Sequence, residues 1–145
     1  MANYYTHYSF VVLHPDPAAC RERLLNDRTF LEAISVAQGF EAEDWGEATD
    51  AAESILTIDA NGKGFWITDD ADHSTDVALA AGQAILKDQN SELPVTFQAS
   101  FTCDKPRLDA YGGMVCVFNK DNHICRSTTN DEFVNGLLAE LADIA

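Results

Sequence analysis

The side chains most able to do covalent chemistry are a thiol and an imidazole, Cys125 and His123, two positions apart near the C-terminus. On an extended strand they share a face, and a thiol beside an imidazole is the minimum for a cysteine nucleophile. Neighbouring side chains on one strand diverge, however, and a catalytic pair normally meets across two elements, with a third group orienting the base. We therefore expect no catalytic residue and a protein that is not an enzyme.

A second candidate for chemistry is the acidic run from Asp69 to His73, whose alternating acids resemble the start of a calcium-binding loop. The glycine and the bidentate glutamate that complete an EF-hand are missing at the required spacing. The run leads into Ser74, a residue suited to cap a helix, so its acids complement the helix dipole. The other metal alternative is a three-cysteine site formed by Cys103, Cys116 and Cys125, but the chain has no Cys-x-x-Cys pair. We expect neither a metal nor a cofactor.

The strongest charge feature is the segment from residue 41 to residue 76, which holds eleven acids against one base, Lys63. Such a field steers a basic partner and resists anions. Trp45 lies amid the acids and offers an aromatic anchor of the kind that dominates many interfaces. The alternative is a solvated face that only keeps the protein soluble. The candidate docking residues are Glu41, Glu43, Asp44, Trp45, Glu47, Asp69, Asp70 and Asp72.

The connection from Asp104 to Gly113 concentrates charge, an aromatic ring, a proline and two glycines in one short stretch. The proline stiffens the chain, and the glycine pair permits a bulge or a close backbone approach. A binding loop would use Lys105, Arg107, Asp109 and Tyr111. The alternative is a structural loop in which Arg107 pairs with Asp109 and fixes the conformation.

This loop, with the pattern Cys-x-Lys-Pro-Arg-x-Asp-Ala-Tyr-Gly-Gly, resembles a stretch of small uncharacterised acidic proteins encoded by phages and other mobile genetic elements. The opening Met-Ala-Asn-Tyr-Tyr is similar to the start of the same proteins. The resemblance covers the two ends of the chain well and the acidic middle poorly. It implies a ferredoxin-like fold and brings no functional residue with it.

Length and charge exclude several classes of protein. A chain of 145 residues has the size of one domain with a self-sufficient core. Its formal net charge of −15 opposes binding to nucleic acid, which depends on Lys and Arg, and binding to anionic membranes. The opening residues lack the pattern of a signal peptide, so we expect a cytoplasmic protein whose four cysteines are reduced.

Hydrophobic periodicity predicts the elements that position these residues. Strands are expected at 4–13, 54–59, 64–68, 95–103, 114–118 and 123–126, with a turn at 119–122 between the last two. Helices are expected from the cap at Asp16 to Gly39, where residues 26–28 allow a break, from the cap at Ser74 through Ile85, and after the capping box of Thr129 and Glu132. The pair Asn61-Gly62 predicts a type I′ turn between the second and third strands. The first six elements follow the β-α-β-β-α-β order of a ferredoxin-like α+β sandwich, here as one domain over residues 1–145. A C-terminal β-hairpin extension and a terminal helix follow it.

These features favour a non-enzymatic accessory protein of a mobile element, which binds a protein with a basic surface through its own acidic surface. One form of this hypothesis is an inhibitor that imitates nucleic acid and blocks a host defence nuclease. The alternative is a small-ligand-binding or enzymatic ferredoxin-like domain that works through the 104–113 loop, which predicts a concave pocket beside that loop. The sequence leaves the oligomeric state open, a homodimer included.

Overall fold

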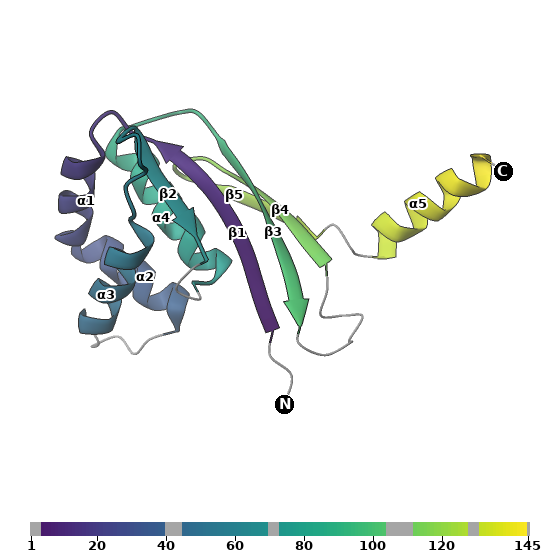
Figure 1. Ribbon diagram of the computed structural model, residues 1–145, viewed down its shortest axis with the longest axis horizontal. Coiled ribbons are helices and arrows are strands. Elements are labelled where there is room, and N and C mark those ends of the chain that lie inside the picture. The colour runs from purple at the N-terminus through teal and green to yellow at the C-terminus, as the bar shows by residue number, and fades with distance from the viewer. Residues whose placement is uncertain (1–3, 40–44, 70–72, 104–111, 128–130, 145) are drawn as a thin grey trace.

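The computed structural model describes residues 4–39, 45–69, 73–103, 112–127 and 131–144. Within these residues the chain forms one five-stranded sheet, and helices α1 to α4 lie together along one of its faces (Figure 1). The elements in chain order are β1 (Tyr4–Leu13), α1 (Pro17–Leu25), α2 (Arg28–Gln38), α3 (Trp45–Ile55), β2 (Gly64–Thr68), α4 (Thr75–Asp88), β3 (Val95–Cys103), β4 (Gly112–Phe118), β5 (His123–Ser127) and α5 (Asp131–Ile144).

The sheet has the strand order β2-β1-β3-β4-β5, and each neighbouring pair is antiparallel. Strand β1 is shared between two partners. Its first half pairs with β3, where His7 lies opposite Ser100, and its second half pairs with β2, where Val11 lies opposite Trp66. Along β1 the even-numbered residues from Tyr8 to Val12 are buried under the helices and the odd-numbered ones are exposed. The sheet therefore has one covered face and one open face.

The α+β class is confirmed, but the expected order of elements is not observed. The predicted strand at 54–59 is wrong, because α3 continues through Ile55 and only Ile58 forms an isolated bridge with Phe65. Buried residues recur on α3 with helical spacing, and these are Ala48, Ala51, Ala52 and Ile55. A split β-α-β unit requires parallel strands, whereas β1 and β2 are antiparallel. The predicted hairpin extension and terminal helix are both present as β4, β5 and α5.

The turn before β2 differs from the predicted type. Gly62 has a φ of +67°, whereas Asn61 does not have a positive φ, as a type I′ turn would require. The amide of Gly62 donates to the carbonyl of Asp59, and the amide of Asp59 donates to the carbonyl of Gly64. This pattern fits a tight turn that ends in one left-handed glycine. Such a turn needs a positive φ at one residue only, and glycine adopts a positive φ without strain.

Side-chain caps divide the first helical segment as its sequence indicates. The carboxylate of Asp16 accepts from the amide of Ala19 at the start of α1. The carboxylate of Asp27 accepts from the amide of Thr29 and so begins α2 at a new angle. Gly39, with a φ of +74°, ends α2 in the left-handed conformation that favours glycine. The expected break at residues 26–28 is therefore confirmed.

The core forms where α4 lies against three aromatic rings of the sheet. Phe10 and Phe97 stack at 4.5 Å between ring centroids, and Phe118 meets each of them edge-on at 6.1 and 6.2 Å. Gly82 of α4 faces the ring of Phe118, where a Cβ atom would lie 2.5 Å from Cζ. The lack of a side chain at Gly82 therefore sets how closely α4 approaches the sheet.

A disulfide joins Cys116 of β4 to Cys125 of β5, so the expectation that all four cysteines are reduced is wrong. The two residues are direct cross-strand partners with Cα atoms 4.2 Å apart, and the register alone brings their sulfur atoms together. Cys20 is a free, buried thiol. His123, the other member of the pair considered for catalysis, therefore has no free thiol at Cys125 beside it.

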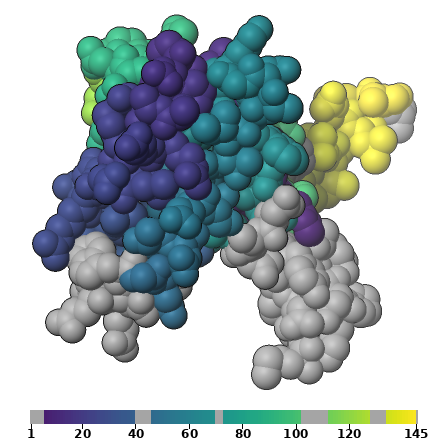
Figure 2. All heavy atoms as spheres, turned by 60° about the vertical axis from the view of Figure 1, so that its left-hand side comes forward, coloured from purple at the N-terminus to yellow at the C-terminus, as the bar shows by residue number. Residues whose placement is uncertain are grey.

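The last helix stands apart from the rest of the molecule. In Figure 1 α5 extends beyond the sheet, on the side away from α1 to α4, and in Figure 2 its outer end projects beyond the body. All of its described side chains, from Val134 to Ile144, are exposed. None of the described side chains of α5 therefore belongs to the core.

Gly82→Ala is expected to destabilise the protein although alanine favours helices. The helical preference contributes about 1 kcal/mol in favour of alanine, but displacing the enclosed ring of Phe118 costs about 1–3 kcal/mol. Gly136→Ala is the matched control, because nothing lies within 4 Å of its Cβ position on α5. Denaturant unfolding should show a loss for Gly82→Ala and no loss for Gly136→Ala. Equal stability of the two variants would contradict this account of α4 packing.

Candidate functional site

The acidic surface expected from the sequence is only partly described by the structure. Glu41, Glu43, Asp44, Asp70 and Asp72 lie outside the described residues, and Trp45 begins α3 without a described side chain. Glu47 is exposed on α3, together with Asp50 and Glu53. These three acids recur at every third position, so α3 presents one continuous acidic side to solvent.

Asp69, the remaining residue of that set, has a structural role. Its carboxylate accepts from the amide of Tyr8 at 3.0 Å and lies 3.3 Å from Nδ1 of His7. The buried hydroxyl of Tyr8 donates to the carbonyl of His73 at 2.9 Å, and burial followed by the charge of Asp69 raises the pKa of Tyr8. Asp69 thus holds the end of β2 against β1 instead of facing solvent with the other acids.

The four loop candidates, Lys105, Arg107, Asp109 and Tyr111, lie outside the described residues. A hollow of about 320 Å³ lies on the open face of the sheet beside the ends of that connection. It is lined by His7, Gln98, Ala99, Ser100, Gly113, Met114 and Val115. The concave surface expected beside the loop is therefore present, but it is shallow and open to solvent.

Three residues around this hollow are of the types found in serine hydrolases. His7 lies between Asp69 on one side and Ser100, its direct partner on β3, on the other. No hydrogen bond joins Ser100 to His7 within the described part of the chain, and the imidazole is half exposed. A nucleophile needs a hydrogen bond to its base and a site that excludes water. The arrangement therefore lacks the central contact of a catalytic triad.

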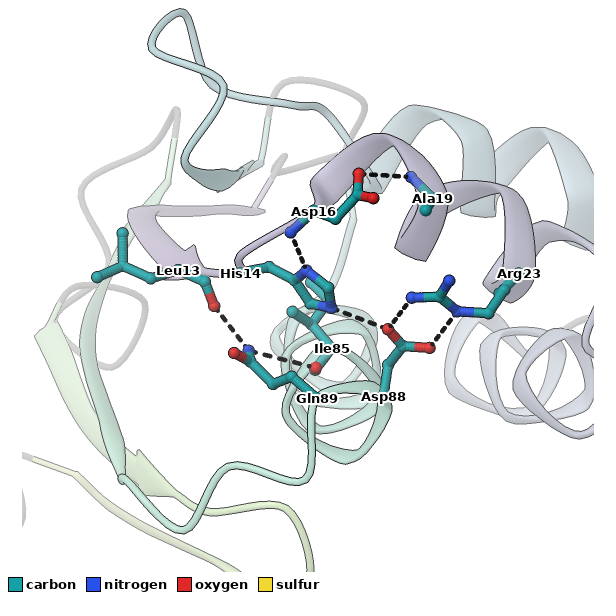
Figure 3. A network of polar contacts seen from close by, with 8 residues as sticks. All are labelled: Leu13, His14, Asp16, Ala19, Arg23, Ile85, Asp88 and Gln89. Atoms are coloured by element: carbon teal, nitrogen blue, oxygen red, sulfur yellow. Dashed lines mark hydrogen bonds and ion pairs between the residues drawn. The ribbon is translucent and has the colours of Figure 1, made fainter.

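The densest polar cluster joins β1, α1 and the end of α4 (Figure 3). Asp88 accepts from Nε and a terminal nitrogen of Arg23 at 2.9 and 2.7 Å, and its Oδ2 lies 2.8 Å from Nε2 of His14. The amide of Asp16 donates to Nδ1 of His14 at 2.9 Å. A backbone amide can only donate, so Nδ1 carries no proton and Nε2 donates its proton to Asp88. Nearby, the side-chain amide of Gln89 donates to the carbonyl of Leu13 at 2.7 Å.

The same cluster contains Cys20, and His14, Cys20 and Asp88 bring three potential metal ligands within 4.8 Å of one another. Burial, followed by a hydrogen bond with Asp88, raises the pKa of Cys20 to about 12, so the sulfur is a neutral thiol near pH 7. Arg23 already binds both oxygens of Asp88. The lone pair of His14 Nδ1 accepts from the amide of Asp16, and Nε2, which faces Asp88, carries the proton. Metals require thiolate and an available imidazole lone pair. The donor set does not fit a metal, and the cluster instead fastens three elements together.

A groove between α2 and α4 begins beside this cluster and has a volume of about 410 Å³. Its base is apolar, with the side chains of Leu24, Phe30, Ala33, Ala80 and Ala84. A second hollow of about 500 Å³ shares Thr29 and Ala33 with it and continues along α2 to Val36. Alanines recur four residues apart on both helices, and these line the two neighbouring hollows: Ala33 and Ala37 on α2, and Ala80 and Ala84 on α4.

The rim of this groove is acidic. Among the described residues, Asp27, Glu32 and Asp76 line the two hollows and Lys87 is the one base that does so, while the charge of Asp88 is matched by Arg23. Sequence reasoning missed both the groove and the cluster. The spacing of the alanines could have indicated the groove. No local sequence pattern connects His14 with Asp88, which is 74 positions away.

Comparison of the chain with known protein families, with curated proteins and with solved structures gives no match. Within the described part of the chain, none of the helices combines the length and the apolar composition that crossing a membrane requires. The candidate site therefore rests on the geometry of this molecule alone.

Asp88→Asn is expected to lower stability by roughly 2 kcal/mol near neutral pH, because it leaves Arg23 and His14 without the carboxylate that they share. Arg23, then the hydrogen bonds from His14 and Cys20, hold the pKa of Asp88 well below its ordinary value of 3.8. A lowered folded-state pKa adds stability above pH 3.8 that is lost as the pH falls toward the folded value. The difference between wild type and variant should therefore shrink below about pH 4.

The control for this experiment is Glu22→Gln, which removes an exposed carboxylate of α1 and should change stability by less than about 0.5 kcal/mol. Urea unfolding is measured for wild type and both variants at each pH. Because each variant loses one negative charge, comparing the two variants separates the loss of the Asp88 contacts from the general effect of net charge. A gap between wild type and Asp88→Asn that stays constant down to pH 2 would show that the ionised carboxylate does not hold the cluster together.

Proposed function

We propose that this chain is a non-enzymatic protein-binding protein, whose acidic helical layer receives a basic segment of another protein. The observation that carries the proposal is the groove between α2 and α4, which combines an apolar base with an acidic rim. A groove of this kind suits an amphipathic helix, whose apolar side fills the channel while its flanking charges meet the rim. The partner chemistry is therefore a helix with leucine-like residues on one side and Lys or Arg on its borders.

Charge supports the same partner. The helical layer carries six exposed acids, two of which, Glu32 and Asp76, line the groove; the six are Glu22, Glu32, Glu47, Asp50, Glu53 and Asp76. Two of the bases in this layer already have partners, since Arg21 donates to the carbonyls of Leu56 and Glu53 and Arg23 binds Asp88. A net charge of −15 accelerates the approach of a basic protein and repels nucleic acid.

The biological setting is part of the proposal and rests on the sequence resemblance to proteins of mobile genetic elements. An accessory protein of such an element gains from occupying a basic, nucleic-acid-binding surface of a host defence nuclease. The acidic side of α3, with Glu47, Asp50 and Glu53, supports this form of the hypothesis because it adds a row of anions to the helical layer. The same resemblance implies a ferredoxin-like fold, and the α+β class of the structure is the one observation that supports it.

A second candidate function is the binding of a small ligand in the hollow on the open face. The observation in its favour is the position of that hollow, which lies between Ser100 and Gly113 at the ends of the connection expected to act as a binding loop. Its polar groups come from His7, Gln98 and Ser100. Ligand-induced shifts confined to these residues in an NMR titration would favour this function over protein binding.

The groove is tested with a synthetic amphipathic Leu-Lys helical peptide and a Leu-Glu peptide of the same length. The Leu-Lys peptide should bind, and its affinity should fall as salt screens the acidic rim, whereas the Leu-Glu peptide should not bind. Ala33→Arg fills the shared part of the groove and should weaken the binding of the Leu-Lys peptide at least about tenfold. Fluorescence anisotropy gives both affinities.

Ala18→Arg is the matched control, because Ala18 is also exposed and helical, lies on α1 away from the groove, and adds the same charge. An equal loss of affinity in both variants would show that only net charge matters and would contradict the groove. With the two variants as baits, mass spectrometry should find a host protein that wild type and Ala18→Arg retain and Ala33→Arg loses.

A further inference from the structure

Helix α5 is amphipathic but covers nothing. Its large apolar side chains are between 44% and 78% exposed, and these are Val134, Leu137, Leu138, Leu141 and Ile144. At about 100° per residue they fall on one side of the helix, whereas Glu140 and Asp143 lie beyond one edge of this stripe. An isolated helix of this length is marginal in water. A surface outside the helix must therefore cover the stripe and stabilise α5.

The open face of the sheet carries an apolar patch on β4 and β5, the two strands that precede α5. Val117 of β4 and Ile124 of β5 are direct cross-strand partners and are 41% and 57% exposed. Val115 and Arg126 form the next pair along the same two strands. The guanidinium of Arg126 donates to the carbonyl of Cys125 and meets no acid in the described part of the chain. The patch therefore offers apolar surface with a cation at its border.

We propose that the stripe of α5 is covered by the Val117 and Ile124 patch of a second copy of this chain, in a two-fold symmetric dimer. The contact is reciprocal, because each copy supplies one helix and one sheet face. Residues 131–144 contain four acids and no Lys or Arg, so α5 complements Arg126 of the other copy. This inference goes beyond the proposed function, because the groove lies between α2 and α4 on the opposite side of the sheet.

Geometry favours a second copy over the same chain. Only residues 128–130 separate β5 from α5, and α5 extends beyond the sheet in Figure 1. A short connection between an element and the body of the molecule favours exchange of that element between copies, so that α5 packs on the sheet of its partner. A helix of 14 residues is about 21 Å long and can lie across about four strands spaced ~4.8 Å apart.

The available area is sufficient for a stable dimer. From the exposed fractions, the stripe and the patch of one copy present roughly 750 Å² of side-chain surface. Complete burial of both surfaces in two reciprocal contacts sets an upper limit on the order of 1,500 Å², which lies within the range of stable interfaces. Each copy carries a formal net charge of −15, so the copies repel one another and added salt should strengthen the dimer.

Sedimentation equilibrium on the full chain tests the proposal. Wild type should be a dimer whose dissociation constant falls as salt rises, the opposite of the salt effect expected for the basic peptide in the groove. Leu138→Glu with Leu141→Glu should raise the dissociation constant at least roughly 100-fold, because it places charges in the apolar contact. Ala139→Glu, at an exposed position on the polar side of α5, is the matched control and should leave the dimer intact.

Exchanging the charges of Arg126 and Glu140 tests the predicted contact between the sheet of one copy and α5 of the other. Arg126→Glu should weaken the dimer, and adding Glu140→Arg in the same chain should restore it. Ala33→Arg should leave the dimer unchanged, because Ala33 lies in the groove and not in the dimer contact. The experiments therefore distinguish an error in the groove proposal from an error in the dimer proposal. A wild type that is monomeric at every concentration and salt would overturn the proposal, whether α5 is then protected from hydrogen exchange by its own sheet or unprotected. A dimer that the α5 variants do not weaken would overturn it as well.

Discussion

The contact between α4 and the sheet determines the rest of the architecture. Because Gly82 has no side chain, the ring of Phe118 reaches the backbone of α4, and the helix lies close above Phe10 and Phe97. At this distance the last turn of α4 places Asp88 within reach of His14 and Arg23. The position of α4 also sets the width of the channel between it and α2. A core contact and a surface groove therefore follow from one glycine.

One-sided packing explains where the molecule has surface to offer. Four helices cover one face of the sheet, and their outer surfaces carry most of the described acids. The other face keeps exposed apolar residues at both ends, with Val11 beside Trp66 and Val117 beside Ile124. The helical face thus offers mainly charge and shape to a partner, whereas the open face and α5 offer apolar surface.

Sequence patterns predicted the elements whose signals are local. The alternation of β1 and β3, the caps at Asp16 and Ser74, and the left-handed end at Gly39 depend on neighbouring residues and were confirmed. Helix α3 was missed because its acids were interpreted as a solvated connector, although its alanines carried a helical period. The disulfide could have been predicted, because Cys116 and Cys125 are equally distant in sequence from the centre of the predicted turn and so lie opposite each other in the hairpin. The contact of His14 with Asp88 depends on the packing of α4, which no local pattern encodes.

The disulfide also determines how the molecule carries a mechanical load. Strand β5 is a five-residue edge strand, and α5 follows it after three residues. Any partner that holds α5 therefore pulls on the edge of the sheet, where hydrogen bonds would otherwise open one after another. The covalent link between Cys116 and Cys125 transfers that force to β4, which is paired on both sides. The edge strand that leads into α5 is thus tied covalently to the interior of the sheet.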